Sequence, residues 1–250
     1  TQTELDSYEC RHGLGYSIIT GKKNSLTAKL ELFVPVGDNC EIDRLVLTNE
    51  SDVPKSFTIF SYLEFCLWNA VDDSTNFQRN FSTGEVEVEG STIYHKTEYR
   101  ERRDHYAVFW ANTPVTSFDT SRDAFCGVYG GPAEPEAVKA GHCSNSMAHG
   151  WAPIGAHHFH LTLEAGETKT ILFGLGYIEN PVAEKFTAPG VINKARAEAM
   201  MARYAAPDAF DRAKETLKAQ WTQLLSGESS FIPISWSMMP RSLSTLSWVK

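Results

Sequence analysis

Alternation of apolar and polar residues with a period of two constrains this sequence most strongly, and it runs from about Leu30 to Tyr177. It is clearest at residues 84–90, where GEVEVEG places valines and glutamates at alternate positions between two glycines. Because successive side chains of a strand point to opposite faces, this segment is predicted to be a strand with one buried face. Glu85, Glu87 and Glu89 would then lie on the face in water.

Residues 56–68 form a second, more apolar strand pattern. Phe57, Ile59, Leu63, Phe65 and Leu67 share one face, and the opposite face is also largely aromatic, so both faces are predicted to be covered. Further strands are predicted at residues 92–100, 106–111, 159–163 and 170–177, with a turn at 164–167. Many strands separated by Gly, Pro, Asn and Asp turns predict a mainly β fold, a large antiparallel sandwich.

The pattern changes after Tyr177. Asn193 is expected to cap a helix over residues 194–204, and Pro207 to begin a second helix that ends at Gly227. One face of this second helix carries Phe210, Lys214, Leu217, Trp221 and Leu224. The prediction is a short helical linker after the sandwich, whereas residues 228–250 are rich in serine and have no steady periodicity.

Charge and cysteine usage exclude several classes of protein. Asp and Glu outnumber Lys and Arg by 31 to 23, so a net charge of −8 would repel nucleic acid and anionic membranes. No apolar run approaches the roughly 18 residues that span a bilayer. The five cysteines are widely scattered, which suggests neither a disulfide framework nor a metal knuckle and favours a reducing, cytoplasmic setting.

The first candidate for chemistry is the loop at residues 72–80, DDSTNFQRN, between two predicted strands. Its Asp, Asn, Gln and Arg side chains offer the donors and acceptors that bind sugar hydroxyls, and Phe77 and Trp68 offer stacking faces. The alternative is a hydrated turn whose side chains cap their own backbone. Carboxylates that could serve sugar hydrolysis are Glu64, Asp72, Asp73 and Glu98.

Three other motifs carry weaker signals. The strip at residues 94–106 mixes bases with aromatics, but its acidic residues favour a self-paired network over a phosphate site. His158 and His160 would share a strand face, yet two histidines without a third ligand indicate a solvent-facing strand edge more than a metal site. Residues 13–16, GLGY, lack the rest of a dinucleotide fingerprint and are predicted to form a turn. We therefore predict no metal and no cofactor.

Longer motifs resemble a known family. RHGLGY at residues 11–16, YLEFCLWNAVDDSTNFQRN at 62–80, STGEVEVEGSTIYHKTEYRERRDHY at 82–106 and LGYIENPVAEKF at 175–186 resemble the cellobiose phosphorylases of glycoside hydrolase family 94. The strings FVP at 33–35 and GWAPIG at 150–155 agree with this. The resemblance covers roughly residues 4–226 and implies a super-β-sandwich at 1–187 and a helical linker at 188–227.

The resemblance also implies a function. The family cleaves β-1,4-linked disaccharides with inorganic phosphate as co-substrate, and its catalytic acid and phosphate-binding groups belong to an (α/α)6 barrel. Within the TNxQRN motif, matched at residues 75–80, the arginine binds the sugar, so Arg79 and, more weakly, Gln78 are the expected substrate-binding residues here. A β-linked glucoside or oligosaccharide is the expected ligand.

Residues 228–250 do not match the family, and a reading-frame change or cloning junction near codon 228 is one hypothesis, with a divergent native terminus as the other. The leading expectation is a truncated N-terminal domain without the barrel, which lacks phosphorolytic activity by itself. The alternative is a stand-alone glycoside hydrolase that uses Asp72, Asp73 or Glu98. A third is an assembly module, since family members are homodimers and Trp221 and Leu224 would expose an apolar helix face.

Overall fold

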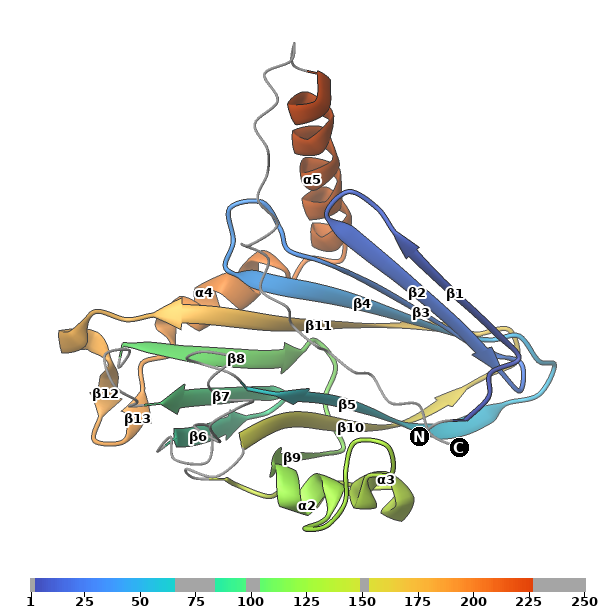
Figure 1. Cartoon of the computed structure of the whole chain (residues 1–250), viewed down its shortest axis with the longest axis horizontal. Coiled ribbons are helices and arrows are strands. Elements are labelled where there is room, and N and C mark those ends of the chain that lie inside the picture. Colours follow the sequence, from blue (N-terminus) through green and yellow to red (C-terminus); the bar gives the residue numbers. More distant parts are fainter. Residues whose placement is uncertain (1–2, 66–83, 98–103, 149–152, 227–250) are drawn as a thin grey trace.

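The computed structural model describes residues 3–65, 84–97, 104–148 and 153–226. Its largest element is an eight-stranded, wholly antiparallel sheet, called here the large sheet, whose strands follow the order β1-β2-β3-β4-β11-β8-β7-β6 (Figure 1). The strands are β1 Ser7–His12, β2 Tyr16–Lys23, β3 Leu26–Phe33, β4 Cys40–Asn49, β6 Gly84–Glu89, β7 Thr92–Thr97, β8 His105–Ala111 and β11 Thr168–Glu179.

A three-stranded sheet, the small sheet, packs against one face of the large one. It has the order β5-β10-β9, with β5 Lys55–Glu64, β9 Ser117–Ser121 and β10 Pro153–Leu163. The core between the sheets is built from alternate residues of both, such as Leu45, Phe109 and Phe173 from the large sheet and Ile59 and Leu163 from the small one. The predicted antiparallel sandwich is confirmed.

Helices cover the outer faces of both sheets, so the fold has four layers (Figure 1). On the large sheet lie α4 Ala195–Arg203 and α5 Ala209–Ser226, which bury Met200, Phe210 and Leu217 against it. On the small sheet lie α2 Arg122–Cys126 and α3 Glu136–Ala140. The connector to α4 contains η2 Val182–Glu184 and a two-stranded ribbon, β12 Phe186–Ala188 with β13 Val191–Ile192.

Strand β5 confirms the prediction that both of its faces are covered. Ile59 and Leu63 enter the core between the sheets, and so does Phe65 directly after the strand. Phe60 and Tyr62 point the other way and contact Phe125 of α2, with ring centroids 6.1 and 5.0 Å apart. A strand with aromatic residues on both faces therefore lies between two apolar layers.

The prediction for β6 is only half right. Val86 is buried as expected, but Glu87 and Glu89 do not simply face water. Both carboxylates form ion pairs with Lys194, which precedes α4, and Glu87 also accepts a hydrogen bond from the Ile192 N–H at 2.6 Å. The glutamates anchor the connector that passes over this face, because acidic side chains can satisfy buried cationic and backbone donors.

Strands β1 and β2 begin well before Leu30, where the alternating pattern starts, and were not predicted. All residues of β1 are exposed and those of β2 are half-buried, so neither shows the contrast between apolar and polar faces that reveals a strand. Residues 13–15 of the GLGY motif lie between these two strands, and Gly15 has a positive φ of 79° that favours glycine. The predicted turn is confirmed.

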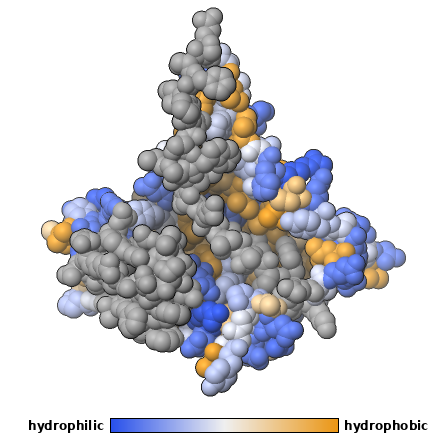
Figure 2. Space-filling view, viewed as in Figure 1, coloured by the Kyte–Doolittle hydropathy of each residue, from blue (hydrophilic) through white to orange (hydrophobic). Residues whose placement is uncertain are grey.

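The two predicted helices are present with small changes. Asn193 Oδ1 accepts a hydrogen bond from the Ala195 N–H at 3.2 Å, which confirms its capping role at the start of α4. In α5, Phe210 and Leu217 are buried, whereas Leu224 is 59% exposed and does not belong to the buried face. Apolar residues also gather along the outer part of α5 in the space-filling view (Figure 2).

One buried amide ties three strand ends together. Asn49, at the end of β4, is fully buried, and its Nδ2 donates to the carbonyl oxygens of Val53, Leu163 and Glu164 at 2.8, 3.2 and 3.0 Å. Since an amide satisfies these acceptors without a charge, it fixes β4 relative to β10. None of the described helices combines the length and the apolar character needed to cross a lipid bilayer.

Candidate functional site

The residues predicted to bind sugar lie outside the described part of the chain. Asp72, Asp73, Gln78 and Arg79 fall within residues 66–83, and Glu98 falls within 98–103. The structure therefore describes the strand ends that carry these segments and leaves the roles of the five side chains as predictions.

These strand ends meet at one end of the sandwich, called here the loop end. Glu64, the last residue of β5, pairs with Ile154 at the beginning of β10. Gly84, the first residue of β6, pairs with Thr97, the last of β7. The strand ends that border residues 66–83, 98–103 and 149–152 thus lie at the same end, where β5, β6 and β7 come together in Figure 1. Loops gathered at one end of a rigid sandwich are a common place for binding residues.

The two sheets are joined at the loop end by an aromatic contact. Phe65, directly before the first of these segments, stacks on His95 of β7 with ring centroids 5.0 Å apart and planes 9° from parallel. His95 is buried, and neither ring nitrogen has a hydrogen-bond partner. Burial, together with nearby His105, lowers the pKa of His95 to about 3. The imidazole is therefore neutral and acts as a packing surface.

A polar cluster lies beside this contact. Glu64 Oε1 accepts hydrogen bonds from the Tyr62 hydroxyl at 2.7 Å and from Arg122 Nε at 3.1 Å. Burial and the adjacent Glu64 raise the pKa of Tyr62, so its hydroxyl remains a donor. Because Oε1 already holds two donors, Glu64 is better suited to fixing the end of β5 than to transferring protons. The sequence offered no signal for the Arg122 pairing, since 58 positions separate the partners.

The strip at residues 94–106 divides between the two faces of the large sheet. Tyr94 and Tyr106 pack on the side covered by α4, whereas His95 faces the small sheet. Asp104 Oδ1 lies 3.1 Å from Lys185 Nζ, and the Lys96 ammonium lies 4.9 Å from the ring centroid of Phe186. These two partners come from the connector before α4 and not from the strip itself, and Glu98, Glu101, Arg102 and Arg103 lie outside the described residues, so the self-paired network stays a prediction.

The histidine prediction is wrong about exposure. Strand β10 is the central strand of the small sheet, so His157 and His158 are buried on opposite faces and do not lie at a solvent-facing edge. His157 stacks on Phe109, and His158 stacks on Phe60 and hydrogen-bonds Ser117 Oγ through Nδ1 at 2.8 Å. Only His160 of the three is exposed. Within the described ranges, no three His, Cys, Asp or Glu side chains are grouped to hold a metal.

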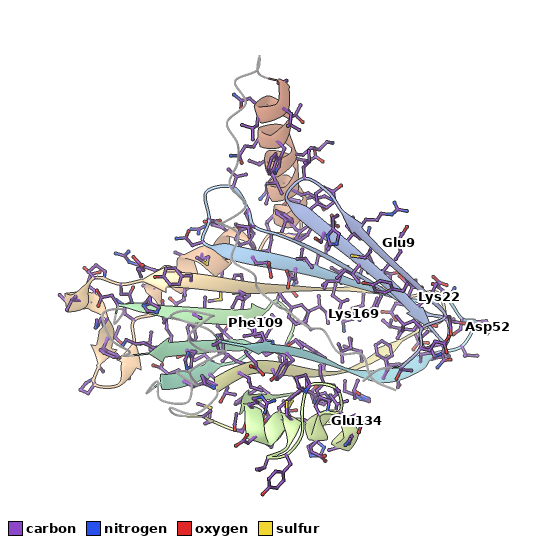
Figure 3. The ribbon with its side chains drawn as sticks, in the orientation of Figure 1. Glu9, Lys22, Asp52, Phe109, Glu134 and Lys169 are labelled. Carbon is purple, nitrogen blue, oxygen red and sulfur yellow. The ribbon has the colours of Figure 1, made fainter. Side chains whose placement is uncertain are left out.

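A shallow hollow of about 480 Å³ lies elsewhere, on the connection between α2 and α3. Its lining includes Gly127, Tyr129, Glu134, Glu136 and Lys139, and the two glutamates each lie 3.3 Å from Lys139 Nζ. Figure 3 shows Glu134 next to α3, on the outer layer. None of the lining residues belongs to the strand ends that define the loop end, so the hollow is separate from the candidate site.

Two unequal antiparallel sheets with helices on both outer faces define a supersandwich domain. The model for the family described as "Glycosyl hydrolase 94, supersandwich domain" matches residues 1–207. The chain belongs to this family.

Several relatives are named as disaccharide phosphorylases. An N,N'-diacetylchitobiose phosphorylase of Vibrio furnissii is 29% identical over 219 residues, which cover 86% of this chain and 25% of that protein. A solabiose phosphorylase of Paenibacillus borealis is 32% identical over 168 residues, which cover 66% of this chain and 22% of that protein. The chain thus spans about a quarter of the length of these relatives.

A solved structure described as that of a candidate kojibiose phosphorylase from human microbiome has the same fold. It superposes with a TM-score of 0.52 over 87% of this chain and 25% of its own, at 14% sequence identity. At this identity the likeness supports the architecture of the domain alone.

Proposed function

We propose that this chain is the supersandwich domain of an enzyme that phosphorolyses a β-linked glucosidic disaccharide, with cellobiose as the substrate and inorganic phosphate as the co-substrate. The observation that carries the proposal is the family match across residues 1–207, joined by relatives that are named as disaccharide phosphorylases. The cellobiose preference rests on the motifs at residues 62–80 and 82–106.

Within this function, we assign sugar binding to Arg79, with Gln78 as a weaker partner. A guanidinium carries several N–H donors in a fixed plane, which suits the spread hydroxyls of a pyranose ring. The described contacts support this assignment. The segment that carries Arg79 follows the end of β5, where Phe65 stacks on His95 and Arg122 donates a hydrogen bond to Glu64. Binding residues often lie on segments that begin from such rigid strand ends.

The proton transfer belongs to another part of the family enzyme. In the resembled phosphorylases one carboxylic acid of the barrel protonates the leaving oxygen while phosphate attacks the anomeric carbon, so the sandwich supplies no acid. We therefore expect the 250-residue chain to bind cellobiose weakly and to consume no phosphate.

A fluorescence titration tests the assignment of Arg79. Cellobiose and N,N'-diacetylchitobiose are added to the 250-residue chain, and tryptophan emission is followed for Arg79→Ala, Arg79→Lys and the wild type. Binding should be lost in Arg79→Ala and weakened in Arg79→Lys, while Arg212→Ala, at an exposed position on α5, should bind as the wild type does. Equal affinity of Arg79→Ala and wild type would contradict the assignment.

An activity assay on the same preparation tests the role of the domain. Glucose 1-phosphate formed from cellobiose and phosphate by this chain alone would overturn the proposal that it supplies binding only. The hydrolase alternative predicts that the chain releases reducing sugar from cellobiose when no phosphate is present. Loss of that release in Asp73→Asn or Glu98→Gln would favour this alternative.

A further inference from the structure

One aromatic side chain on the connection between α2 and α3 is not used by the packing of the fold. Tyr129 is fully exposed, and Val128 beside it is largely exposed. A buried tyrosine removes about 150–250 Å² of surface from water, so this residue leaves that stabilisation unused. The hollow of about 480 Å³ lies at the same connection, and both residues contribute to its lining. The ring is therefore available to a ligand that enters the hollow.

Buried neighbours fix the turn that carries Tyr129. Phe125 and Cys126, at the end of α2, are fully buried against the small sheet. Directly after them, the Gly130 N–H donates to the Gly127 carbonyl at 3.1 Å and closes a four-residue turn. A Cβ atom at residue 130 would lie 2.0 Å from the Cys126 carbonyl oxygen, so only glycine permits this close approach. The backbone of Tyr129 is thus held in place before any ligand arrives.

Charged side chains supply the polar part of the lining. Helix α3 is anchored by buried Ala137 and Val138, and Glu134, Glu136 and Lys139 contribute to the hollow beside it (Figure 3). Each of the two glutamates lies 3.3 Å from Lys139 Nζ. A carboxylate accepts up to about four hydrogen bonds and an ammonium donates three. The ion pairs therefore leave further acceptors on both glutamates and a further donor on the lysine.

The composition of this lining selects one class of ligand. Two carboxylates against one ammonium give the hollow a net negative charge, which disfavours phosphate and other anions. Both carboxylates are already paired with Lys139, which disfavours a free cation. A wholly apolar ligand would dehydrate three charged groups without offering them a partner. A neutral sugar meets each requirement, because its C–H face can pack on the tyrosine ring and its hydroxyl groups both donate and accept hydrogen bonds.

We infer that the hollow is a second carbohydrate-binding site, in which Tyr129 stacks on a pyranose ring of a neutral glucan while Glu134, Glu136 and Lys139 bond its hydroxyl groups. Its volume of about 480 Å³ lies within the range of small-molecule sites, about 300–1,000 Å³. Because the hollow is shallow, binding should be weak, and the neighbouring units of a longer glucan can extend into solvent. The site shares no residue with the strand ends that define the loop end, so it is independent of the proposed function.

Affinity electrophoresis tests the site with hydroxyethyl cellulose, a neutral soluble glucan, in a native gel. Because Arg79 is proposed to bind sugar elsewhere, all variants of the 250-residue chain are made in an Arg79→Ala background, which the polysaccharide should still retard. Tyr129→Ala should raise the dissociation constant about tenfold, whereas Tyr129→Phe keeps the ring and should bind within about twofold of the background. Tyr8→Ala, at an exposed tyrosine of β1, is the matched control and should leave binding unchanged.

Lysine variants test the polar part of the site in the same gels. Lys139→Met removes an ammonium donor and should raise the dissociation constant about fivefold, as expected for the loss of one hydrogen bond. Lys218→Met removes the same charge from an exposed pairing with Glu215 on α5, 3.5 Å apart, and should leave binding unchanged. The two variants carry equal charge, so their mobilities without polysaccharide are directly comparable.

Either of two results would overturn the inference. If the Arg79→Ala background migrates equally with and without polysaccharide, no glucan binds outside the Arg79 site. If Tyr129→Ala is retarded as strongly as the background, the remaining glucan binds somewhere other than the hollow. The assignment of Arg79 is decided separately, by the cellobiose titration of the chain with Tyr129 intact. Circular dichroism confirms that each variant is folded.

Discussion

The imidazole of His157 stacks on the ring of Phe109 in the centre of the sandwich, with centroids 4.5 Å apart and planes 17° from parallel. His157 comes from β10 of the small sheet and Phe109 from β8 of the large one, so the contact joins the two sheets. His157 is fully buried and neither of its ring nitrogens has a partner. A residue that often titrates near neutral pH is used here as an aromatic packing group.

Acid should destabilise this core. Burial lowers the pKa of His157 to about 3, and burial with nearby His105 does the same for His95. Above pH 6.5 both folded and unfolded states hold neutral imidazoles, so stability is full. As the pH falls from 6.5 toward 3, only the unfolded state gains protons, and each histidine should cost about 2 kcal/mol at pH 5 relative to pH 7. Urea denaturation at the two pH values measures the loss.

The variant His157→Phe isolates this effect. It keeps an aromatic ring against Phe109 and removes a protonation site, so the difference in unfolding free energy between pH 7 and pH 5 should shrink by about 2 kcal/mol. His160→Gln, at an exposed position of the same strand, serves as the matched control. An unchanged pH dependence in His157→Phe would show that the buried imidazole is not the acid-sensitive group.

Loss of the Phe65 ring should destabilise the loop end. Phe65 is 7% exposed and lies against His95, so Phe65→Ala leaves a cavity between the sheets and should cost about 3–5 kcal/mol in chemical denaturation. Val53→Ala, at a position that is 54% exposed, should change stability by no more than about 0.5 kcal/mol. A cost for Phe65→Ala close to that of the control would mean that the stack does not hold this end together.

The alternation of apolar and polar residues along the sequence predicts the sandwich well, as strand β5 illustrates. In β5 the aromatics on both faces require two apolar layers, and the structure supplies the core on one side and α2 on the other. The same alternation does not reveal which charged residues form ion pairs with each other. Glu87 and Glu89 look like solvent-facing residues in GEVEVEG, and their pairing with Lys194 depends on a connector more than a hundred positions away.

The candidate site could be predicted only through the family resemblance. Side-chain chemistry alone leaves the Arg79 segment between a sugar-binding loop and a hydrated turn. The supports of that segment, Arg122 on Glu64 and His95 on Phe65, are contacts between residues distant in sequence and have no local signature. The exposure of His158 was predicted wrongly for a physical reason: polarity suggests exposure, but an imidazole can stack on a buried phenyl ring, as His158 does on Phe60.

A buried carboxylate holds α5 on the large sheet. Glu31 of β3 is 2% exposed, forms an ion pair with Lys214 of α5 and accepts a hydrogen bond from Arg44 at 3.1 Å. Burial alone would raise the pKa of Glu31, but the hydrogen bonds from Lys214 and Arg44 outweigh it and lower the pKa. The stability this provides is present above the unfolded pKa of about 4.5 and is lost as the pH falls below it.

Glu31→Gln should therefore cost about 3 kcal/mol at pH 7, because two cations lose a buried partner. Glu215→Gln on the same helix removes an exposed pairing with Lys218, 3.5 Å apart, and should cost no more than about 0.5 kcal/mol. Urea denaturation of the two variants measures both losses of unfolding free energy. Equal costs would show that the buried pairing contributes no more than a surface one.

Lys194 should control how firmly the connector and α4 are held. Its ammonium is paired with Glu87 and Glu89 of β6 and lies 5.2 Å from the ring centroid of Tyr94, and its side chain is only 9% exposed. Burial would lower the pKa of Lys194, but the two glutamates outweigh it and raise the pKa, so the charge persists at neutral pH. Lys194→Met keeps the aliphatic chain and leaves two carboxylates without their cation.

The stability cost of Lys194→Met should be about 2–4 kcal/mol, and amide hydrogen exchange should quicken first in residues 191–203. Lys218→Met, on an exposed face of α5, should leave exchange in that range unchanged. Exchange equally slow in Lys194→Met and the wild type would mean that apolar packing of Met200 and Tyr204 alone secures α4.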